Sequence, residues 1–189
     1  MITIKSLIVV SVTLIFTACS TESPKSKNIE DETRHLDSFK SEYLSAVNTA
    51  RSVKQDCGEK GIFLSAPALT WNENLYAAAY EHSLDMATNN SFSHNGTGEL
   101  SDVTGSKLGH KSNGGERISA QGYVWHNYGE NIGAGTNRNT AQKMVKGFLE
   151  SDSHCANLMN AKFKELGMAM VEKNSTKYTH YWTQSFGTH

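Results

Sequence analysis

The chain has few cysteines and few prolines, and neither sign of charge predominates. It holds three cysteines and two prolines in 189 residues, with 18 basic against 19 acidic side chains and a net charge of −1. Three cysteines are too few for a disulfide-built miniprotein or for a zinc site of four thiolates. Balanced charge argues against a nucleic-acid binder, which usually carries a basic face. A hydrophobic content of 38% excludes a disordered chain, so we expect one globular domain, with or without a tail.

Several common catalytic motifs are also absent. The chain has no HExxH, CxxC, GxxxxGK[ST] or GxSxG, which are signatures of zincin, dithiol, P-loop and serine-hydrolase sites. Gly133-Ala134-Gly135 lacks the remaining glycine of a dinucleotide fingerprint. No nucleophile beside a base is evident, since Ser151 three residues before His154 is a common arrangement at a helix end.

The long apolar run of the chain lies near its N-terminus. Residues 6–16 (SLIVVSVTLIF) follow a short segment with one positive charge. A run of this length matches the hydrophobic region of a signal peptide better than a membrane span. It ends in Phe16-Thr17-Ala18-Cys19, which resembles the lipobox of bacterial lipoproteins, whose cysteine is acylated and becomes the new N-terminus. Ordinary cleavage near Ala18, leaving Cys19 as a free thiol, is the alternative.

The N-terminal features predict three segments: a signal peptide over 1–18, a lipidated N-terminus with a flexible polar tether over 19–35, and a folded domain over 36–189. Acyl chains on Cys19 would anchor the protein to a membrane. In a cell with two membranes, Ser20 is compatible with outer-membrane sorting. We therefore expect a lipoprotein of the cell envelope, at the outer membrane or the periplasmic face, with secretion as the alternative.

Export also bears on the other two cysteines. An exported domain folds in an oxidising compartment, where disulfides persist. Pairing of Cys57 with Cys155 is therefore favoured over two separate buried thiols.

Hydrophobic periodicity predicts helices early in the domain and strands at its end. Apolar residues at helical spacing indicate helices over 36–55, 72–89 and 140–150, and a helical turn over 156–159. Residues 91–129 show no sustained period and are expected to lack regular structure, with Arg117 anchoring them by hydrogen bonds or an ion pair. Strands over 164–172 and 178–186 would form a hairpin. Helices first and a hairpin last indicate an α+β fold.

Four segments occur in an order that resembles the CAP superfamily, also called the SCP domain (cysteine-rich secretory proteins, antigen 5, pathogenesis-related 1). They are LTWNENLYAAAYEHSLDMA (69–87), GENIGAG (129–135), FLESDSHCANLMN (148–160) and YWTQSFG (181–187). Each motif alone is weak, but four in this order, within about Phe39 to Gly187, are specific. The resemblance implies a three-layer α-β-α sandwich with a small antiparallel sheet. It also supports the Cys57–Cys155 disulfide, since bacterial relatives carry one at the HC pair after the third helix.

The resemblance further implies a cleft where histidines and acids meet and often bind a divalent metal. His94 matches the first family histidine, Glu130 the acid of the GEN motif and His154 the bacterial histidine after the third helix. Ser151 and Tyr181 stand where eukaryotic members have Glu and His, so the full tetrad is not reproduced. His94 and His154 could ligate zinc, with Glu130 as third ligand, as a base or as the group that orients an imidazole. The same three residues could instead form a hydrogen-bonded cluster that organises the loop.

Three functions remain open at the level of sequence. The leading prediction is an exported, membrane-anchored CAP-domain protein that binds a small apolar ligand or a protein partner through the cleft, without catalysis and without nucleic acid. The second is a metal-assisted hydrolase of the protease type, with Glu130 as base and His94 and His154 as ligands of a divalent metal such as zinc. The third is a structural domain of the cell envelope. The residues do not specify the ligand or the oligomeric state.

Overall fold

The structure is a computed structural model that describes the backbone of residues 24–189 and the side chains from Leu36 onward. Residues 36–189 form a compact unit. The predicted signal peptide and the predicted lipidation site at Cys19 lie outside the described residues. Within residues 24–189, no helix combines the length and the apolar character that crossing a membrane requires.

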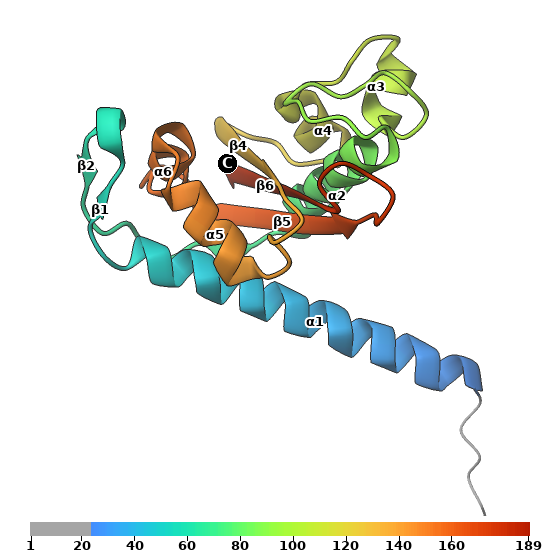
Figure 1. Cartoon of the computed structure of the whole chain (residues 1–189), viewed down its shortest axis with the longest axis horizontal. Helices are drawn as coiled ribbons and strands as arrows, with labels where there is room; N and C mark the ends of the chain where they lie inside the picture. Colours follow the sequence, from blue (N-terminus) through green and yellow to red (C-terminus); the bar gives the residue numbers. More distant parts are fainter. Residues whose placement is uncertain (1–23) are drawn as a thin grey trace, which may run out of the picture. The chain divides into compact units, whose positions relative to one another are not determined.

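All elements except β3 and η1 are labelled in Figure 1. In chain order they are α1 (Pro24–Arg51), β1 (Gln55–Asp56), the 3-10 helix η1 (Gly58–Lys60), β2 (Ile62–Phe63), β3 (Thr70–Trp71), α2 (Glu73–Thr88), α3 (Val103–Leu108), α4 (Gly114–Ala120), β4 (Asn127–Ala134), α5 (Ala141–Leu149), α6 (Asp152–Leu158), β5 (Glu165–Glu172) and β6 (His180–Thr188). The main sheet has the order β3-β5-β6-β4, and β1 and β2 form a separate small antiparallel ribbon. Strand β6 pairs antiparallel with both β4 and β5, whereas the short β3 pairs parallel with β5.

Helices pack on both faces of the main sheet. Successive side chains of a strand point to opposite faces, so each face carries apolar residues that a helix covers. Trp182 and Phe186 of β6 join the main core, which also contains buried residues of α1, α5 and α6. Tyr181, one residue from Trp182, packs on the other face with Met86 of α2. The fold is therefore α+β with three layers, as predicted.

Helix α2 lies directly against strand β5, and a glycine permits this close approach. A side chain at Gly167 would overlap backbone atoms of Leu75 and Tyr76 in α2. The hydroxyl of Ser83, further along α2, donates a hydrogen bond to Thr183 Oγ1 of β6 (2.9 Å). The α2 face of the sheet is therefore held by backbone packing and buried polar contacts as well as by apolar side chains.

The helices predicted over 72–89 and 140–150 correspond closely to α2 and α5. Both begin at the expected type of capping residue. The side chain of Asn72 accepts hydrogen bonds from the backbone N–H groups of Asn74 and Leu75, and Thr140 accepts one from Lys143. The strand predicted over 164–172 is likewise β5.

The expectation that residues 91–129 lack regular structure is wrong. This stretch contains α3, α4 and the start of β4. Asp102 caps α3 by accepting a hydrogen bond from Gly105 N–H, and Asn113 and Glu116 form a reciprocal capping box at α4. Helices of six and seven residues are too short to show a periodic pattern of apolar residues. Their capping residues are therefore the only local signal for them in the sequence.

Other boundaries also differ from the prediction. Helix α1 begins at Pro24, inside the segment predicted as a tether, and ends at Arg51. Helix α6 begins at Asp152, earlier than the turn predicted over 156–159, and β6 covers His180–Thr188. The GENIGAG segment was given no secondary structure at the level of sequence, and glycines are unusual in a strand. It forms most of β4, where its residues 129–134 pair with residues 181–186 of β6.

Candidate functional site

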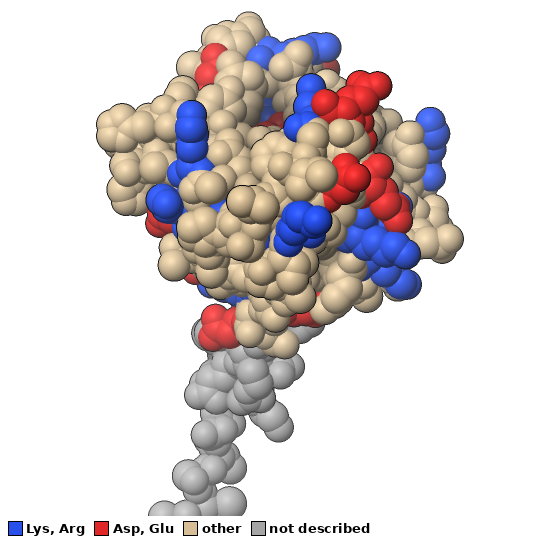
Figure 2. All heavy atoms as spheres, turned by 90° about the vertical axis from the view of Figure 1, so that its left-hand side faces the viewer, with Lys and Arg blue, Asp and Glu red and all other residues tan. Residues whose placement is uncertain are grey.

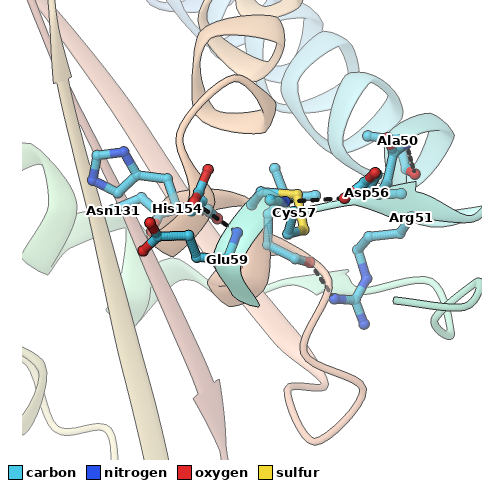
Figure 3. The surroundings of a disulfide bond; sticks show 12 residues. Ala50, Arg51, Asp56, Cys57, Glu59, Asn131 and His154 are labelled. Carbon is cyan, nitrogen blue, oxygen red and sulfur yellow. Dashed lines mark hydrogen bonds between the residues drawn. A yellow bond between two sulfur atoms is a disulfide. The ribbon is translucent and has the colours of Figure 1, made fainter. Parts of the chain in front are cut away.

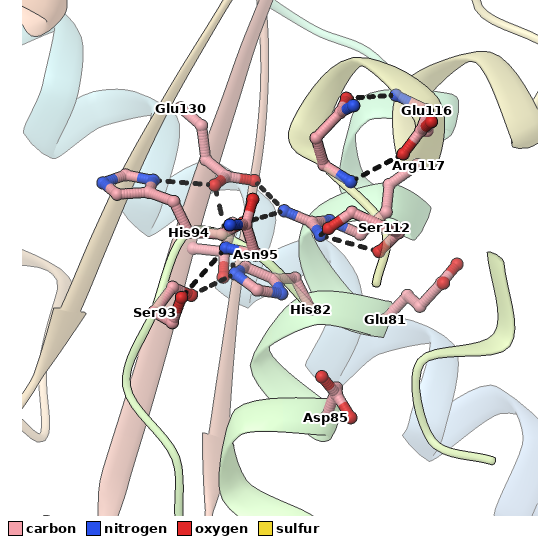
Figure 4. Close-up of polar contacts among 12 residues, drawn as sticks. Glu81, His82, Asp85, Ser93, His94, Asn95, Ser112, Glu116, Arg117 and Glu130 are labelled. Atoms are coloured by element: carbon pink, nitrogen blue, oxygen red, sulfur yellow. Dashed lines mark hydrogen bonds and ion pairs between the residues drawn. The ribbon is translucent and has the colours of Figure 1, made fainter. Parts of the chain in front are cut away.

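A polar cluster of His82, His94, Arg117 and Glu130 surrounds one buried carboxylate. Glu130 lies on β4 opposite Ser185 of β6, so its side chain points to the α2 face of the sheet. Its side chain is only 6% exposed. Figure 4 shows the carboxylate between the ring of His94 and the guanidinium of Arg117.

Both carboxylate oxygens of Glu130 have a donor. Oε1 accepts a hydrogen bond from Nδ1 of His94 at 2.9 Å, and Oε2 accepts one from Nη2 of Arg117 at 2.8 Å. His82 Nε2 lies 3.9 Å from Oε1. Bonding of Nδ1 to Glu130 turns Nε2 of His94 away from the carboxylate (Figure 4), on a side chain that is 55% exposed.

Arg117 ties the long loop to the sheet, as predicted. Its side chain is buried, and Nη2 also donates to the backbone oxygen of His94 (2.9 Å). Its Nη1 donates to Ser112 twice, to the backbone oxygen (3.0 Å) and to Oγ (2.8 Å). One guanidinium therefore connects Glu130 of β4 with residues 94 and 112, on either side of α3.

The protonation states of the two buried members follow from their surroundings. Burial lowers the pKa of His82 to about 4, so the ring is neutral at pH 7 and its Nε2–H donates to the backbone oxygen of Ser93 (2.9 Å). Burial opposes ionisation of Glu130. The hydrogen bond from His94 and the charge of Arg117 outweigh it and hold the pKa of Glu130 below its usual value. Glu130 is therefore a carboxylate at neutral pH.

His154 approaches His94 from helix α6. The two ring centroids are 6.5 Å apart, and the ring of Phe148 stands edge-on to His154 at 5.4 Å. Burial, and then the nearby His94, lower the pKa of His154. Both effects favour a neutral imidazole at pH 7. The structure therefore brings His94, Glu130 and His154 to one place.

The predicted disulfide between Cys57 and Cys155 is confirmed, with a Cα–Cα distance of 5.4 Å. It joins the start of η1 to α6, next to His154 (Figure 3). Asp152 in the first turn of α6 also accepts a hydrogen bond from the backbone N–H of Glu59 (2.9 Å). These links fix the beginning of α6, the helix that carries His154.

Tyr181 lies apart from this cluster, and the side chain of Ser151 forms no hydrogen bond with it. Tyr181 is fully buried and donates its hydroxyl hydrogen to Asn90 Oδ1 (3.0 Å). It shares a sheet face with Glu130, but lies four positions from Ser185, the register partner of Glu130. That spacing corresponds to about 13 Å along a strand. Ser151 occupies the N-cap position of α6 without a side-chain capping bond.

The arrangement does not fit a zinc centre of three protein ligands. Among the residues that the structure describes, no group of three or more His, Cys, Asp or Glu side chains is placed to hold a metal ion. Both oxygens of Glu130 are engaged, and Arg117 already supplies the compensating charge. His94 and His154 remain, fewer than the three protein ligands usual at a catalytic zinc.

Comparison with known proteins identifies the family. The sequence profile described as "CAP: Cysteine-rich secretory protein family" matches residues 44–186. The chain belongs to the CAP family. The match covers α2 to α6 and nearly all of the main sheet of this CAP domain, and it includes every member of the polar cluster.

Several relatives of this CAP domain are bacterial proteins. The uncharacterized protein YkwD of Bacillus subtilis (strain 168) is 30% identical over 115 residues, which are 61% of this chain and 37% of the relative. The chain thus spans well under half the length of that protein. An extracellular protein containing a SCP domain from Bacillus anthracis superposes with a TM-score of 0.51 at 27% identity, over 66% of this chain and 35% of the other. An outer surface protein of Borrelia burgdorferi has a TM-score of 0.52 at 17% identity, over 66% and 80%, a likeness of fold alone.

Two features of the CAP domain were missed at the level of sequence. His82 was assigned no role, although a histidine among the apolar positions of α2 signals a buried polar contact. The second is a pocket beside α4 that is lined by Trp125 and Tyr128. The residues that line this pocket come from separate segments between residues 104 and 128, which show no apolar periodicity. No local sequence pattern therefore indicates that they lie together.

Proposed function

We propose that this CAP-domain protein is exported, is held at a membrane by lipid on Cys19, and binds a small ligand or a protein partner at the surface formed by His94 and His154. The fixed, exposed ring of His94 is the observation that carries the proposal. Its Nδ1 is bonded to a buried carboxylate that Arg117 neutralises. Burying such an ion pair costs stability, and here it orients an imidazole at the surface.

Binding is favoured over hydrolysis by the state of Glu130. A general base needs an unprotonated atom within hydrogen-bond reach of the substrate, and both oxygens of Glu130 already accept hydrogen bonds within the protein. Within the described residues, no hydroxyl or thiol is hydrogen-bonded to the ring of His94 or His154. Nothing in the geometry therefore favours the hydrolase hypothesis.

The distribution of charge agrees with a small ligand or a protein partner. Figure 2 shows basic and acidic side chains interspersed over one face of the molecule, with much of that face uncharged. Nucleic-acid binding would call for a continuous basic patch. Export is supported by the disulfide, a bond that persists outside the cytoplasm, and by the extracellular protein of Bacillus anthracis that shares the fold.

The binding proposal can be tested by following the ring resonances of His94 and His154 by NMR. A lipid extract and an envelope protein fraction from the source organism are added separately to the purified protein. We expect one of the two additions to shift both sets of resonances, and His94→Ala to abolish the shift at His154. His126→Ala, which removes an exposed histidine outside the cluster, serves as the matched control. Unchanged spectra with both additions would refute the proposal.

A further inference from the structure

A pocket of about 700 Å³ lies between α3, α4 and the segment that precedes and begins β4. This volume is within the range of small-molecule sites. The pocket is lined by Thr104, Lys107, Leu108, Asn113, Gly115, Glu116, Ser119, Ala120, Trp125 and Tyr128. It is separate from the ring surface of His94 and His154, neither of which lines it.

Two aromatic rings form a fixed surface in this pocket. Trp125 and Tyr128 stand edge to face with centroids 4.6 Å apart, and they remain 37% and 38% exposed. Trp125 Nε1 donates to Ser119 Oγ (3.0 Å), which holds the indole in one orientation. At Gly115 an added Cβ would lie 3.0 Å from Tyr128 and 3.3 Å from Trp125. The absence of a side chain there lets both rings lie against the backbone of α4.

The polar groups left at the pocket are chiefly donors. Asn113 Oδ1 accepts from the backbone N–H of Glu116 (3.0 Å), while its Nδ2 group forms no hydrogen bond with the described residues. The Glu116 carboxylate is occupied by the backbone N–H of Asn113 (2.8 Å) and by His110 (2.9 Å). Lys107 forms no ion pair within residues 36–189 and adds an ammonium group at the rim. A matching ligand therefore offers acceptor oxygens next to an apolar face.

We propose that this pocket binds a pyranose ring of a glycan. The axial C–H face of such a ring is apolar and flat enough to lie on the indole of Trp125, with the ring of Tyr128 against its edge. Its hydroxyl oxygens accept hydrogen bonds from Asn113 and Lys107. An acyl chain would cover the same aromatic surface without using these exposed donors, whereas a pyranose uses both the surface and the donors. Binding here requires neither His94 nor His154, so it stands apart from the proposed ring surface.

Titration of the purified protein with chitotriose, cellotriose and maltotriose tests the proposal, with sodium palmitate in parallel. We expect at least one trisaccharide to bind and to change the tryptophan fluorescence, because Trp125 is exposed in the pocket. Trp182 is fully buried, and Trp71 does not line the pocket. Trp125→Ala should weaken binding about tenfold or more, the scale of losing a central aromatic contact.

Three further variants make the outcome unambiguous. Ala120→Arg places a long side chain in the pocket without removing Trp125, and it should also weaken binding. This variant keeps the proposal testable if Trp125→Ala proves unstable. Tyr80→Ala removes a comparably exposed aromatic ring (44%) from α2 and should leave the affinity unchanged. His94→Ala should also leave it unchanged, which separates this site from the proposed ring surface. Binding of palmitate alone, of no trisaccharide, or equal affinity in Ala120→Arg would overturn the proposal.

Discussion

Burial of His82 inside the polar cluster makes the stability of the domain depend on pH. Its pKa is about 4 in the folded protein against 6.5 for an ordinary histidine. Between these values the unfolded chain takes up a proton that the folded protein does not, so the free energy of unfolding falls as the pH drops from about 6.5 to 4. The loss is on the order of 3 kcal/mol, and the lowered pKa of Glu130 extends it to more acidic pH.

Urea denaturation at pH 7.5 and pH 4.5 measures this dependence. We expect His82→Gln to reduce the difference between the two midpoints, since the uncharged amide has no proton to gain. His126→Gln, at an exposed histidine, should retain the wild-type difference. If His82→Gln shows the same difference between the two midpoints as the wild-type protein, a group other than His82 causes the pH dependence of stability.

The ion pair of Arg117 with Glu130 is expected to be costly to break from one side. Arg117→Met leaves a buried carboxylate without its cation, which should lower the free energy of unfolding by about 3 to 5 kcal/mol. The double variant Arg117→Met/Glu130→Gln should lose less than the sum of the two single variants. Arg138→Met removes an exposed ion pair with Glu150 (3.5 Å) and should cost about 1 kcal/mol or less. Additive losses at Arg117 and Glu130 would contradict the pairing.

The position of Arg117 also disfavours binding of the predicted metal at Glu130. Because its guanidinium already neutralises Glu130, we expect neither EDTA nor added Zn²⁺ to change the melting temperature of the purified protein. His94→Ala/His154→Ala, which removes both remaining imidazoles, is the control for any effect seen. A rise in melting temperature with Zn²⁺ that this double variant lacks would support a metal on the two histidines instead.

At the scale of elements, the disulfide is the covalent link between the start of η1 and α6. It spans 98 residues, and closing so long a loop in the unfolded chain stabilises the folded state by about 4 to 5 kcal/mol in the chain-entropy model. Cys57→Ala/Cys155→Ala should therefore lower the free energy of unfolding by several kcal/mol in urea and broaden the NMR resonances of His154.

A thiol titration gives the complementary measurement. The unreduced protein, denatured and lipidated, should show no free thiol, because Cys57 and Cys155 are paired and Cys19 is acylated. One reactive thiol would indicate an unmodified Cys19, and equal stability of the double alanine variant would show that the bridge contributes little.

The sequence could predict those elements whose own residues include both a capping side chain and a periodic apolar stripe. Helices α2 and α5 combine a capping side chain with an apolar stripe, so both were found nearly to the residue. Helices α3 and α4 have caps but too few turns for a stripe, and β4 is built of residues that rarely form strands. The formation of these elements depends on buried contacts between residues far apart in the chain, such as the hydrogen bond from Ser112 to Asp102. No local sequence pattern reveals such contacts.

At the scale of the whole molecule, attachment to a membrane is expected to depend on Cys19. Acyl chains there would supply the apolar surface for anchoring, and none of the described helices can span a membrane. When the full chain is expressed in bacteria, Cys19→Ser should move it from the membrane to the soluble fraction. Ser20→Ala should leave it in the membrane fraction. Retention of Cys19→Ser in the membrane would contradict lipid attachment at this position.

The sequence by itself determined the family, the α+β class, the disulfide partners and the closeness of His94, Glu130 and His154, because motif order and residue identity carry these properties. Tertiary structure alone decided what Glu130 can do. Its charge state depends on burial and on donors 13 and 36 residues away, Arg117 and His94. It also separated Tyr181 from the cluster and assembled the aromatic pocket, since distances between side chains on different elements arise only when the sheet and helices pack together.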